Sequence, residues 1–566
     1  MKNIKNLFRL NFLALGLFLS SVAGQAQAIS THYFGENAWM PDTIGNATAC
    51  TDPPCVLNGI LHKQWNNIKA SHAGLIRFGG TAADKNRPTN YQYLRVIDSI
   101  RANGMEPIIQ VPFFNYRYTA AQAAEIVHFI NVTSKRNVKY WVIGNEPDLG
   151  YSYTTAAQIA AYFKPFASAM KEVDPNILIV GPELASFNQA IIDGLTQPGG
   201  ASDITGKDAA GRYYLDVISF HTYPFNGSQN RAQVVSSLAA PAKSLQANLS
   251  YLNSRVASCN ANHSRFGASV LKTAVTEANI DWQNDASDNL EGVGANSFLG
   301  GQFIAEMLGI GMQNGVDFVN LWSVVEGNGA GSSIGYIDPV LNIKKPAYYH
   351  FQMIAGNFKG TSIKAASNQP NVKVFASQDA QQTAVMILNE DASADFTYTV
   401  RLNANAITSA QALKINISAG QAGEYSEVVH NQSTLVLIFN SGGVLIKKYV
   451  YSMSNNAVAN MAPTVSNLVV TGVANAGPAA VKQDIVVYPN PNAGKFTVKM
   501  TGSDTEGKVY EVEMFNLEGQ LVMHKDTPFI NGKLDIDTEG NIASGAYIVR
   551  VKDGNKLIVK KMLVQK

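Results

Sequence analysis

Short apolar runs alternate with helix-length amphipathic segments from residue 29 to about residue 357. This alternation is typical of repeated β-α units that build a parallel sheet. The apolar runs are expected to form strands at residues 32–39, 75–80, 107–113, 140–147, 177–183, 217–223, 273–279 and 316–324. Eight apolar strands, each followed by a helix, predict an α/β domain that forms a closed (β/α)8 TIM barrel over residues 29–357.

The segments between these runs carry apolar residues at three- and four-residue steps, which predicts helices with one apolar face. The recurrence is regular between the fourth and fifth strands and after the sixth, and looser after the seventh. The positions are Ile159, Phe163, Phe166 and Met170, then Leu245, Leu249, Leu252 and Val256, then Phe298, Phe303, Met307 and Ile310. Each such face can cover the wall of a barrel.

The helix period vanishes beyond about residue 358. Apolar runs such as VKVFAS, TAVMILN and STLVLIF follow, and they predict an antiparallel β-sandwich at residues 358–451. Residues 452–483 are rich in Asn, Ala, Pro and Val with few charges and are expected to form a linker. Residues 484–566 predict a small all-β, immunoglobulin-like domain whose strands are broken by Asn, Gly and Asp turns.

The N-terminus has the organisation of a secretory signal peptide over residues 1–28. Basic residues precede an apolar run at 12–23 and the tripeptide Ala26-Gln27-Ala28, so cleavage is expected after Ala28. That run is too short to span a membrane, and no later segment approaches the roughly 20 apolar residues that a span requires. The protein is therefore expected to be exported, with no transmembrane segment.

The composition, with 46% hydrophobic and 15% charged residues and a net charge of +2, is that of a globular protein. It excludes a disordered chain and offers no basic surplus for binding nucleic acid. Cys50 and Cys55 could close a small disulfide loop or could be free thiols, and Cys259 is left over. Three cysteines are too few to suggest metal or redox chemistry, so no metal or cofactor is expected.

Polar residues stand at the carboxyl ends of most predicted strands, against their apolar trend. In a parallel barrel these ends converge on the face where active sites lie. The residues are Arg77, Asn145, Glu146, Glu183, His221, Tyr223, Glu277 and Trp322. Glu146 and Glu277, on the fourth and seventh strands, can face each other across the barrel mouth. Glycoside hydrolysis needs two such carboxyl groups, about 5 to 5.5 Å apart for retention of anomeric configuration and about 6.5 to 9.5 Å apart for inversion.

The motif GNEP at 144–147, and Glu277 within AVTEAN, resemble the strand-four and strand-seven signatures of the retaining glycoside hydrolases of clan A. The clan usually carries an Arg after strand two, a His or Tyr pair on strand six and a Trp on strand eight. The matching residues here are Arg77, His221, Tyr223 and Trp322. The resemblance covers about residues 30–360 and implies that Glu146 is the acid/base and Glu277 the nucleophile.

The same resemblance implies roles for the neighbouring residues. Asn145 would bind the sugar 2-OH, and Trp322 would form an apolar floor under the sugar. Arg77 and Tyr223 would keep the nucleophile charged, while burial would raise the pKa of the acid/base.

The sequence resembles two different groups of families within the clan. IRFGGTAAD at 76–84 is similar to heparanases and β-glucuronidases, whereas HTYPF at 221–225 is similar to endoglucanase- and xylosidase-type families. Lys85, Arg87 and Arg117 could meet a uronic acid or sulfate, or could be solvated surface charges.

The last segment, of about 80 residues, closely resembles the type A C-terminal sorting domain of the type IX secretion system of Bacteroidetes. The PNP opening at 489–491, the strand GAYIVRV at 545–551 and a lysine-rich end occur in that order. This resemblance implies the type IX secretion machinery as a partner, passage through the outer membrane, and a secreted or cell-surface location.

Several candidate side chains could instead serve the structure. His221 could be a structural histidine bonded within the barrel mouth, and Glu183 could be a positioning or solvent-facing residue. Aromatic residues after strands three, four and seven could stack on sugar rings or only pack locally. They are Tyr116, Tyr118, Tyr151, Tyr153 and Trp282.

The sequence thus predicts a secreted retaining glycoside hydrolase that cuts a polysaccharide or oligosaccharide by double displacement through a covalent glycosyl-enzyme. The alternative is a surface carbohydrate-binding protein built on a catalytically silent barrel, against which the intact pair of Glu146 and Glu277 argues. A metal-dependent hydrolase is disfavoured because the strand ends supply one histidine and no HxH or HExxH spacing occurs.

Overall fold

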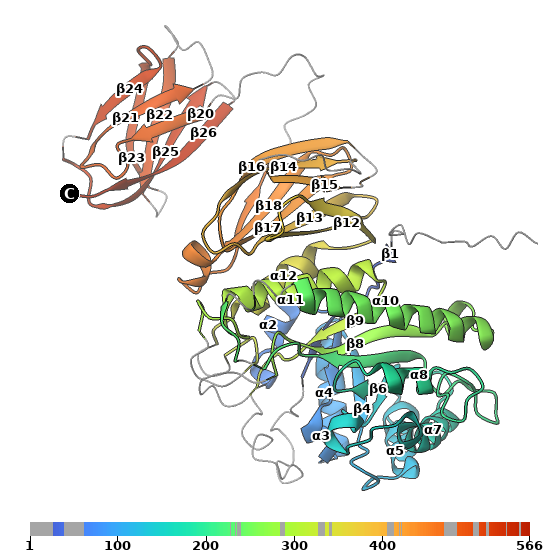
Figure 1. Ribbon diagram of the computed structural model, residues 1–566. Helices are drawn as coiled ribbons and strands as arrows, with labels where there is room; N and C mark the ends of the chain where they lie inside the picture. The colour runs from blue at the N-terminus through green and yellow to red at the C-terminus, as the bar shows by residue number, and fades with distance from the viewer. Residues whose placement is uncertain are drawn as a thin grey trace, which may run out of the picture. The chain divides into compact units, whose positions relative to one another are not determined.

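Figure 1 shows the computed structural model of the chain, which divides into two compact units, Met1–Val470 and Thr471–Lys566. The structure describes residues 27–38, 61–85, 87–226, 228–231, 234, 239–282, 289–326, 334–338, 342–403, 413–417, 419, 422–468, 484–501, 509–516, 520–538, 540–553 and 556–566. Cys50, Cys55 and residues 1–26 of the expected signal peptide lie outside this part of the chain.

The first unit contains a closed barrel of eight parallel strands, which confirms the predicted TIM barrel. The strands follow the order of the sequence, and β9 pairs back onto β2 through Asn320 and Gly35 to close the ring. They are β2 (Phe34–Asn37), β3 (Leu75–Phe78), β4 (Glu106–Val111), β5 (Tyr140–Ile143), β6 (Leu178–Leu184), β7 (Val217–Thr222), β8 (Lys272–Ala278) and β9 (Phe318–Leu321). Each lies within one residue of a predicted apolar run.

Helices connect the strands around the outside of the barrel (Figure 1). They are α2 (Trp65–Ala70), α3 (Thr81–Lys85), α4 (Asn90–Ala102), α5 (Ala120–Val127), α6 (Pro147–Gly150), α7 (Ala156–Val173), α8 (Gln189–Leu195), α10 (Ala239–Asn262), α11 (Phe298–Gln313) and α12 (Pro346–Asn357). Helices α4, α5 and α7 begin with the same Thr-x-x-Gln capping box, in which each side chain accepts a hydrogen bond from the other residue's backbone N–H. The pairs are Thr89 with Gln92, Thr119 with Gln122, and Thr155 with Gln158.

The helix faces predicted to be apolar are buried. Helix α11 differs from the others, because every residue from 298 to 312 is buried. A Cβ on Gly309 would lie 2.2 Å from the ring of Phe375, which belongs to the sandwich. Because α11 is covered by the sandwich as well as by the barrel, its apolar residues need no regular period.

An antiparallel β-sandwich follows the barrel within the same unit, as predicted. A seven-stranded sheet in the order β1-β10-β12-β13-β17-β18-β19 shares an apolar core with a four-stranded sheet in the order β11-β15-β14-β16, where β14 and β15 are a parallel pair. The strands are β1 (Gln27–Ala28), β10 (Thr361–Ile363), β11 (Ala365–Ser367), β12 (Val372–Gln378), β13 (Gln382–Asn389), β14 (Phe396–Leu402), β15 (Leu413–Ile417), β16 (Gly423–Val429), β17 (Ser433–Asn440), β18 (Leu445–Ser452) and β19 (Thr464–Asn467).

Both edges of the larger sheet use residues that the sequence pattern assigns elsewhere. Gln27 and Ala28, expected to end the signal peptide, form β1 and pair with Ser362 and Thr361 of β10. Residues 464–467, expected to lie in the linker, form β19 beside β18. Edge strands this short are held by backbone hydrogen bonds, so apolar periodicity does not reveal them.

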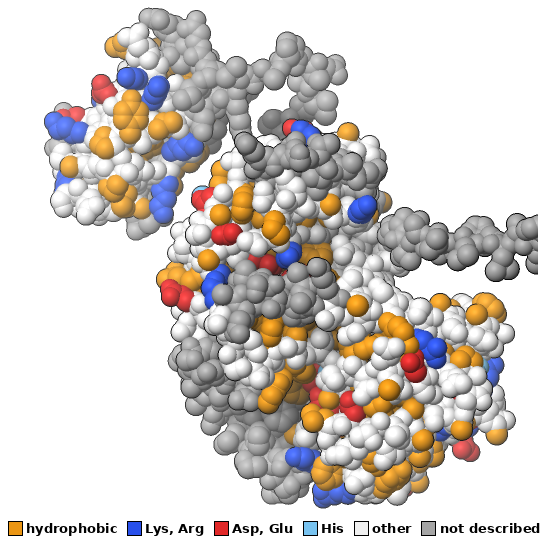
Figure 2. Space-filling model, viewed as in Figure 1, with side chains coloured by type: hydrophobic (Ala, Val, Ile, Leu, Met, Phe, Trp, Pro, Cys, Tyr) orange, Lys and Arg blue, Asp and Glu red, His pale blue; other side chains and the backbone are white. Residues whose placement is uncertain are grey.

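Charged side chains are dispersed over the face of the barrel and sandwich that Figure 2 shows. Figure 2 shows Lys, Arg, Asp and Glu scattered singly or in small groups across the viewed face of the barrel and the sandwich. Beneath the surface, apolar residues of α11, α12 and the sandwich belong to one buried cluster that joins these two parts.

His350 on α12 is a polar contact between the barrel and the sandwich. Its Nδ1 lies 2.8 Å from the Pro346 carbonyl oxygen, and its Nε2 lies 2.8 Å from Thr434 Oγ1 on β17. The carbonyl can only accept, so Nδ1 carries the proton and Nε2 accepts from the Thr434 hydroxyl. Burial lowers the pKa of His350 to about 4.

Acid is expected to destabilise this junction. The ordinary pKa of histidine is about 6.5, so the unfolded chain binds more protons than the folded one between pH 6.5 and 4, and the free energy of unfolding falls as the pH drops through that window. The contribution is on the order of 3 kcal/mol. Urea unfolding at pH 7 and pH 4.5 should show that the free energy of unfolding falls less with pH for His350→Gln than for the wild type. Equal losses would contradict the assignment.

The second unit is a two-sheet β domain, as predicted for the C-terminal segment. One sheet has the order β20-β21-β24 and the other β23-β22-β25-β26, and apolar residues of both form a core of their own. The strands are β20 (Asp484–Tyr488), β21 (Lys495–Thr501), β22 (Val509–Asn516), β23 (Leu521–Pro528), β24 (Lys533–Asp537), β25 (Gly545–Asp553) and β26 (Lys556–Val564).

Candidate active site

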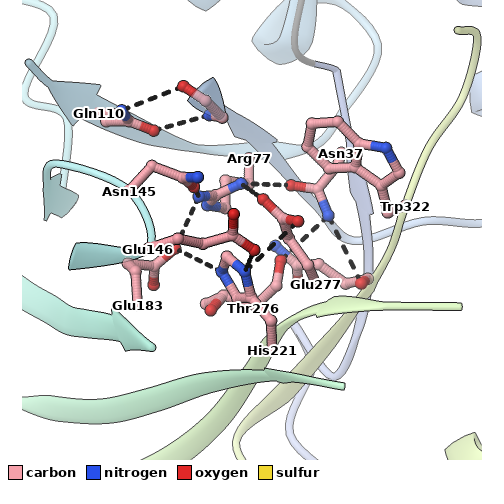
Figure 3. A network of polar contacts seen from close by, with 12 residues as sticks. Asn37, Arg77, Gln110, Asn145, Glu146, Glu183, His221, Thr276, Glu277 and Trp322 are labelled. Atoms are coloured by element: carbon pink, nitrogen blue, oxygen red, sulfur yellow. Dashed lines mark hydrogen bonds and ion pairs between the residues drawn. The ribbon is translucent and has the colours of Figure 1, made fainter. Parts of the chain in front are cut away.

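The polar residues predicted at the strand ends meet in one network at the carboxyl ends of the barrel strands (Figure 3). Six different strands, or the turns that follow them, supply these residues. Arg77 lies on β3, Asn145 and Glu146 follow β5, Glu183 lies on β6, His221 on β7, Tyr223 follows β7, Glu277 lies on β8, and Trp322 follows β9. The barrel topology thus assembles residues that are up to 245 positions apart in the sequence (322 − 77).

Glu146 and Glu277 are close neighbours across the barrel mouth. One carboxylate oxygen of each, together with an imidazole nitrogen of His221, lie within 4.8 Å of one another. His221 Nδ1 is 2.9 Å from Glu146 Oε1 and 3.4 Å from Glu277 Oε2. Tyr223 donates its hydroxyl hydrogen to Glu277 Oε2 at 2.7 Å. The nearest carboxylate oxygens of Glu146 and Glu277 therefore lie within 4.8 Å of each other, with His221 bonded between the two groups.

The backbone around the GNEP motif is sharply bent. Glu146 and Glu183 both adopt left-handed conformations, with φ of +45° and +61°. The Glu146 N–H donates to the Glu183 carbonyl oxygen at 3.0 Å, which joins the ends of β5 and β6. Pro147, whose fixed φ suits a first helical position, then begins α6. Left-handed residues other than glycine are costly and concentrate at functional sites.

Arg77 is fully buried and connects four side chains. Its Nη1 donates to Glu277 Oε1 at 2.8 Å and to Asn37 Oδ1 at 2.9 Å. Its Nη2 donates to Asn145 Oδ1 at 2.7 Å and pairs with Glu183 Oε2 at 2.7 Å. The planar guanidinium fork thereby fixes these side chains relative to one another.

Glu183 is fully buried, so the expectation that it could face solvent is wrong. It is a positioning residue that pairs with Arg77, lies 3.3 Å from His221 Nε2 and accepts from Ser219 Oγ at 2.7 Å. Burial alone would raise the pKa of Glu183, but Arg77 and His221 lower it to about 2. Glu183 is therefore a permanent negative charge within the site.

The surroundings of His221 favour its imidazolium form. Burial opposes its charged form, but Glu277, Glu146 and Glu183 surround the ring and raise the pKa of His221 to about 10. Nδ1 then donates to Glu146 and Nε2 to Glu183. This agrees with the structural role considered for His221, since its hydrogen bonds orient both carboxyl groups.

Burial raises the pKa of Glu277. His221, Arg77 and the Tyr223 hydroxyl favour the charged carboxylate, as expected from the sequence, but burial and the neighbouring Glu146 outweigh them. Burial, a neighbouring carboxyl group and cationic partners thus act on Glu277 in opposite directions.

A cavity of about 630 Å³ opens beside the two glutamates. It is lined by Thr81, Asn145, Glu146, Leu149, Ala185, Ser186, Tyr223, Glu277, Trp282, Trp322, Glu326 and Ile334. Asn145 and Trp322 thus reach the cavity, as their expected contacts with a sugar require. Arg77 and His221 lie behind its wall and act on Glu146 and Glu277 instead.

Of the five aromatic candidates, Trp282 lines this cavity and is 58% exposed. The four tyrosines do not line it. Tyr151 and Tyr153 pack edge-on against Phe113, which shows local packing for these two. Trp282 therefore remains the candidate for stacking on a sugar ring.

Glu146, His221 and Glu277 lie close enough together for one atom of each to surround a metal ion. Both nitrogens of His221 already lie within hydrogen-bond distance of carboxylate oxygens, Glu146 Oε1 at 2.9 Å and Glu183 Oε2 at 3.3 Å.

Two residues of the site escaped the sequence analysis. Asn37, at the end of β2, accepts from Arg77 and donates to the Thr276 carbonyl oxygen at 3.0 Å. Glu326, after β9, accepts from Trp322 Nε1 at 3.3 Å and lines the cavity. Asn37 could have been identified as a candidate, because its amide interrupts the apolar run of the predicted first strand at FGEN.

Residues 486–565 match the family described as the Secretion system C-terminal sorting domain. The second unit is therefore the sorting domain of a type IX secretion substrate, and the protein is exported to the cell surface or beyond. Within the described ranges, no helix combines the length and the apolar character that crossing a membrane demands. The comparison with curated proteins gives no match.

The chain is similar in structure to a family 51 α-L-arabinofuranosidase from Bifidobacterium longum, with 13% identity, a TM-score of 0.50, and coverage of 66% of this chain and 85% of that one. A glycoside hydrolase family 44 xyloglucanase from Paenibacillus polymyxa gives 15% identity and a TM-score of 0.49, with coverage of 74% of this chain and 98% of that one. A bacterial orthologue of human α-L-iduronidase gives 14% identity and a TM-score of 0.49, with coverage of 95% of this chain and 98% of that one. The expected barrel fold is confirmed, and at these identities the comparison speaks of the fold alone.

Proposed function

We propose that the protein is a retaining glycoside hydrolase in which Glu277 is the nucleophile and Glu146 the acid/base. The observation that carries the proposal is the approach of their carboxylate oxygens to within 4.8 Å on the wall of one cavity. Retaining enzymes place their carboxyl groups about 5 to 5.5 Å apart, because the nucleophile must touch the anomeric carbon while the acid touches the leaving oxygen.

The reaction balances in two steps. In the first, a Glu277 oxygen bonds to the anomeric carbon, the glycosidic C–O bond breaks, and Glu146 gives its proton to the leaving oxygen. In the second, Glu146 takes a proton from water, the water oxygen bonds to the anomeric carbon, and the ester to Glu277 breaks. Both carboxyl groups return to their starting states, so no cofactor is required.

The charges of the site suit this cycle. Arg77 and His221 supply two positive charges, and Glu183 supplies one negative charge. The cluster is neutral when Glu146 and Glu277 hold one proton between them. One carboxylic acid and one carboxylate are the forms that the first step needs.

The test is the anomeric configuration of the first-formed product. A panel of aryl glycosides of both anomers identifies a substrate, and NMR during hydrolysis shows whether the product retains the configuration of that substrate. Retention is expected. Inversion would contradict the double displacement. An absence of turnover across the panel, together with polysaccharide binding in a pull-down, would favour the silent carbohydrate-binding alternative.

A Glu146→Ala variant is expected to lose about 10²- to 10⁴-fold in kcat/KM on substrates with poor leaving groups, because no acid then protonates the departing oxygen. Activated aryl glycosides should lose less in the first step, since their phenolate leaves without a proton. Steady-state kinetics across leaving groups of different pKa measures the difference. Glu125→Gln, at an exposed site on α5, serves as the control and should match the wild type. A uniform loss across all leaving groups would argue against the acid role.

A further inference from the structure

A third carboxyl group, which the proposed reaction does not use, lines the same cavity. Glu326 follows β9 and accepts hydrogen bonds from Trp322 Nε1 at 3.3 Å and from the Ile334 backbone N–H. Burial and the neighbouring Glu277 raise the pKa of Glu326, and Lys345 at the start of α12 acts in the opposite direction. Lys345 does not line the cavity.

The described lining contains three acidic side chains and no Lys or Arg. Arg77, the nearest guanidinium in the network, is fully buried and engaged with Glu277 and Glu183. The loop cations that the sequence analysis considered for a uronic acid or sulfate do not line the cavity either. They are Lys85, Arg87 and Arg117.

An anionic sugar would meet an unfavourable environment in this cavity. A carboxylate or sulfate that leaves water needs a cationic partner, most effectively a guanidinium, and like charges nearby repel it. Uncharged hydroxyl groups, by contrast, donate readily to a carboxylate such as Glu326. Trp282 and Trp322 offer apolar surfaces for the C–H face of a sugar ring.

We infer that the cavity takes an uncharged sugar, and that Glu326 accepts hydrogen bonds from its hydroxyl groups and excludes uronic acid and sulfated sugars. This inference rests on the proposed glycosidase function. It favours the endoglucanase- and xylosidase-type resemblance over the heparanase and β-glucuronidase one.

Matched aryl glycosides test the sugar class. Glucosides and glucuronides, and galactosides and galacturonides, of both anomers differ at C6 alone, and xylosides and arabinofuranosides extend the neutral set. The preferred substrate is expected to be neutral, with kcat/KM for any uronide at least about 100-fold lower. A uronide hydrolysed as fast as its neutral partner would overturn the inference. If no glycoside of the panel reacts, the proposed function fails, and equilibrium binding of neutral oligosaccharides against oligogalacturonides and heparin oligosaccharides still decides the sugar class.

Two variants separate the charge of Glu326 from its hydrogen bonds. Glu326→Gln keeps an acceptor for Trp322 and should reduce the discrimination against uronides about tenfold or more. Glu326→Ala should raise KM for the neutral substrate about tenfold, with a smaller change in kcat. Glu172→Gln, at an exposed site on α7, controls for loss of one negative charge. Thermal unfolding confirms that each variant is folded. If both folded variants keep the wild-type KM and discrimination, Glu326 does not contact the sugar.

Discussion

Glu277→Ala is expected to lower kcat/KM by about 10⁴-fold or more, because the variant cannot form the glycosyl-enzyme on which both steps depend. Glu277 is the carboxyl group that accepts from Arg77 at 2.8 Å and from Tyr223 at 2.7 Å, so it is held in place by two donors. The loss is measured with the best aryl glycoside of the panel. Residual activity within tenfold of the wild type would exclude Glu277 as the nucleophile.

Azide should restore turnover to this variant. The missing side chain leaves space for a small anion that attacks the anomeric carbon directly, and a single displacement gives a glycosyl azide of the opposite anomeric configuration. NMR of the product distinguishes this outcome from hydrolysis by contaminating enzyme, which azide would not accelerate. Glu146→Ala provides the comparison, because azide acting in its deglycosylation step gives a product of retained configuration.

Arg77→Met is expected to lower the free energy of unfolding by about 3 to 5 kcal/mol. The substitution removes a buried guanidinium and leaves the carboxylate of Glu183, which is fully buried, without its strongest partner. Urea unfolding followed by tryptophan fluorescence measures the change. A Glu183→Gln substitution in the same chain should recover part of the loss, since the uncompensated charge is then gone.

Arg77→Lys is the matched control for this prediction. It keeps the positive charge but cannot donate to four acceptors at once, so its stability should lie between those of the wild type and Arg77→Met. A free energy of unfolding for Arg77→Met within about 0.5 kcal/mol of the wild type would contradict the prediction, because that is the range of ordinary surface substitutions.

The barrel could be predicted because its strands are apolar on both faces and each is followed by a helix. All eight runs, from FGEN to FVNL, became strands in sequence order. The short pairings β1–β10 and β18–β19 could not be predicted, since edge strands depend on which neighbour offers free backbone groups. The apolar residues of α11 recur at irregular steps because the sandwich covers this helix as well as the barrel does, which only the packed structure reveals.

The proximity of Glu146 and Glu277, the pair proposed to react, could be predicted from their strand positions, but the surroundings of the pair could not. The sequence placed Glu146 and Glu277 at the ends of opposed strands, and the structure brings them together. The sequence could not show that Glu183 is buried against Arg77, because it does not distinguish a buried glutamate at a strand end from an exposed one. The upward shift of the pKa of Glu277 likewise depends on the depth of burial, which no motif encodes.

The contact between α11 and Phe375 has a practical consequence for handling the protein. Methionine, leucine and valine side chains of the sandwich, including Met386 and Val436, belong to the same apolar cluster as the barrel. A chain ended near residue 357 would present that cluster to water and should aggregate. The apolar residues of the sorting domain form a core of their own, so a chain ended near residue 470 should keep the fold of the first unit.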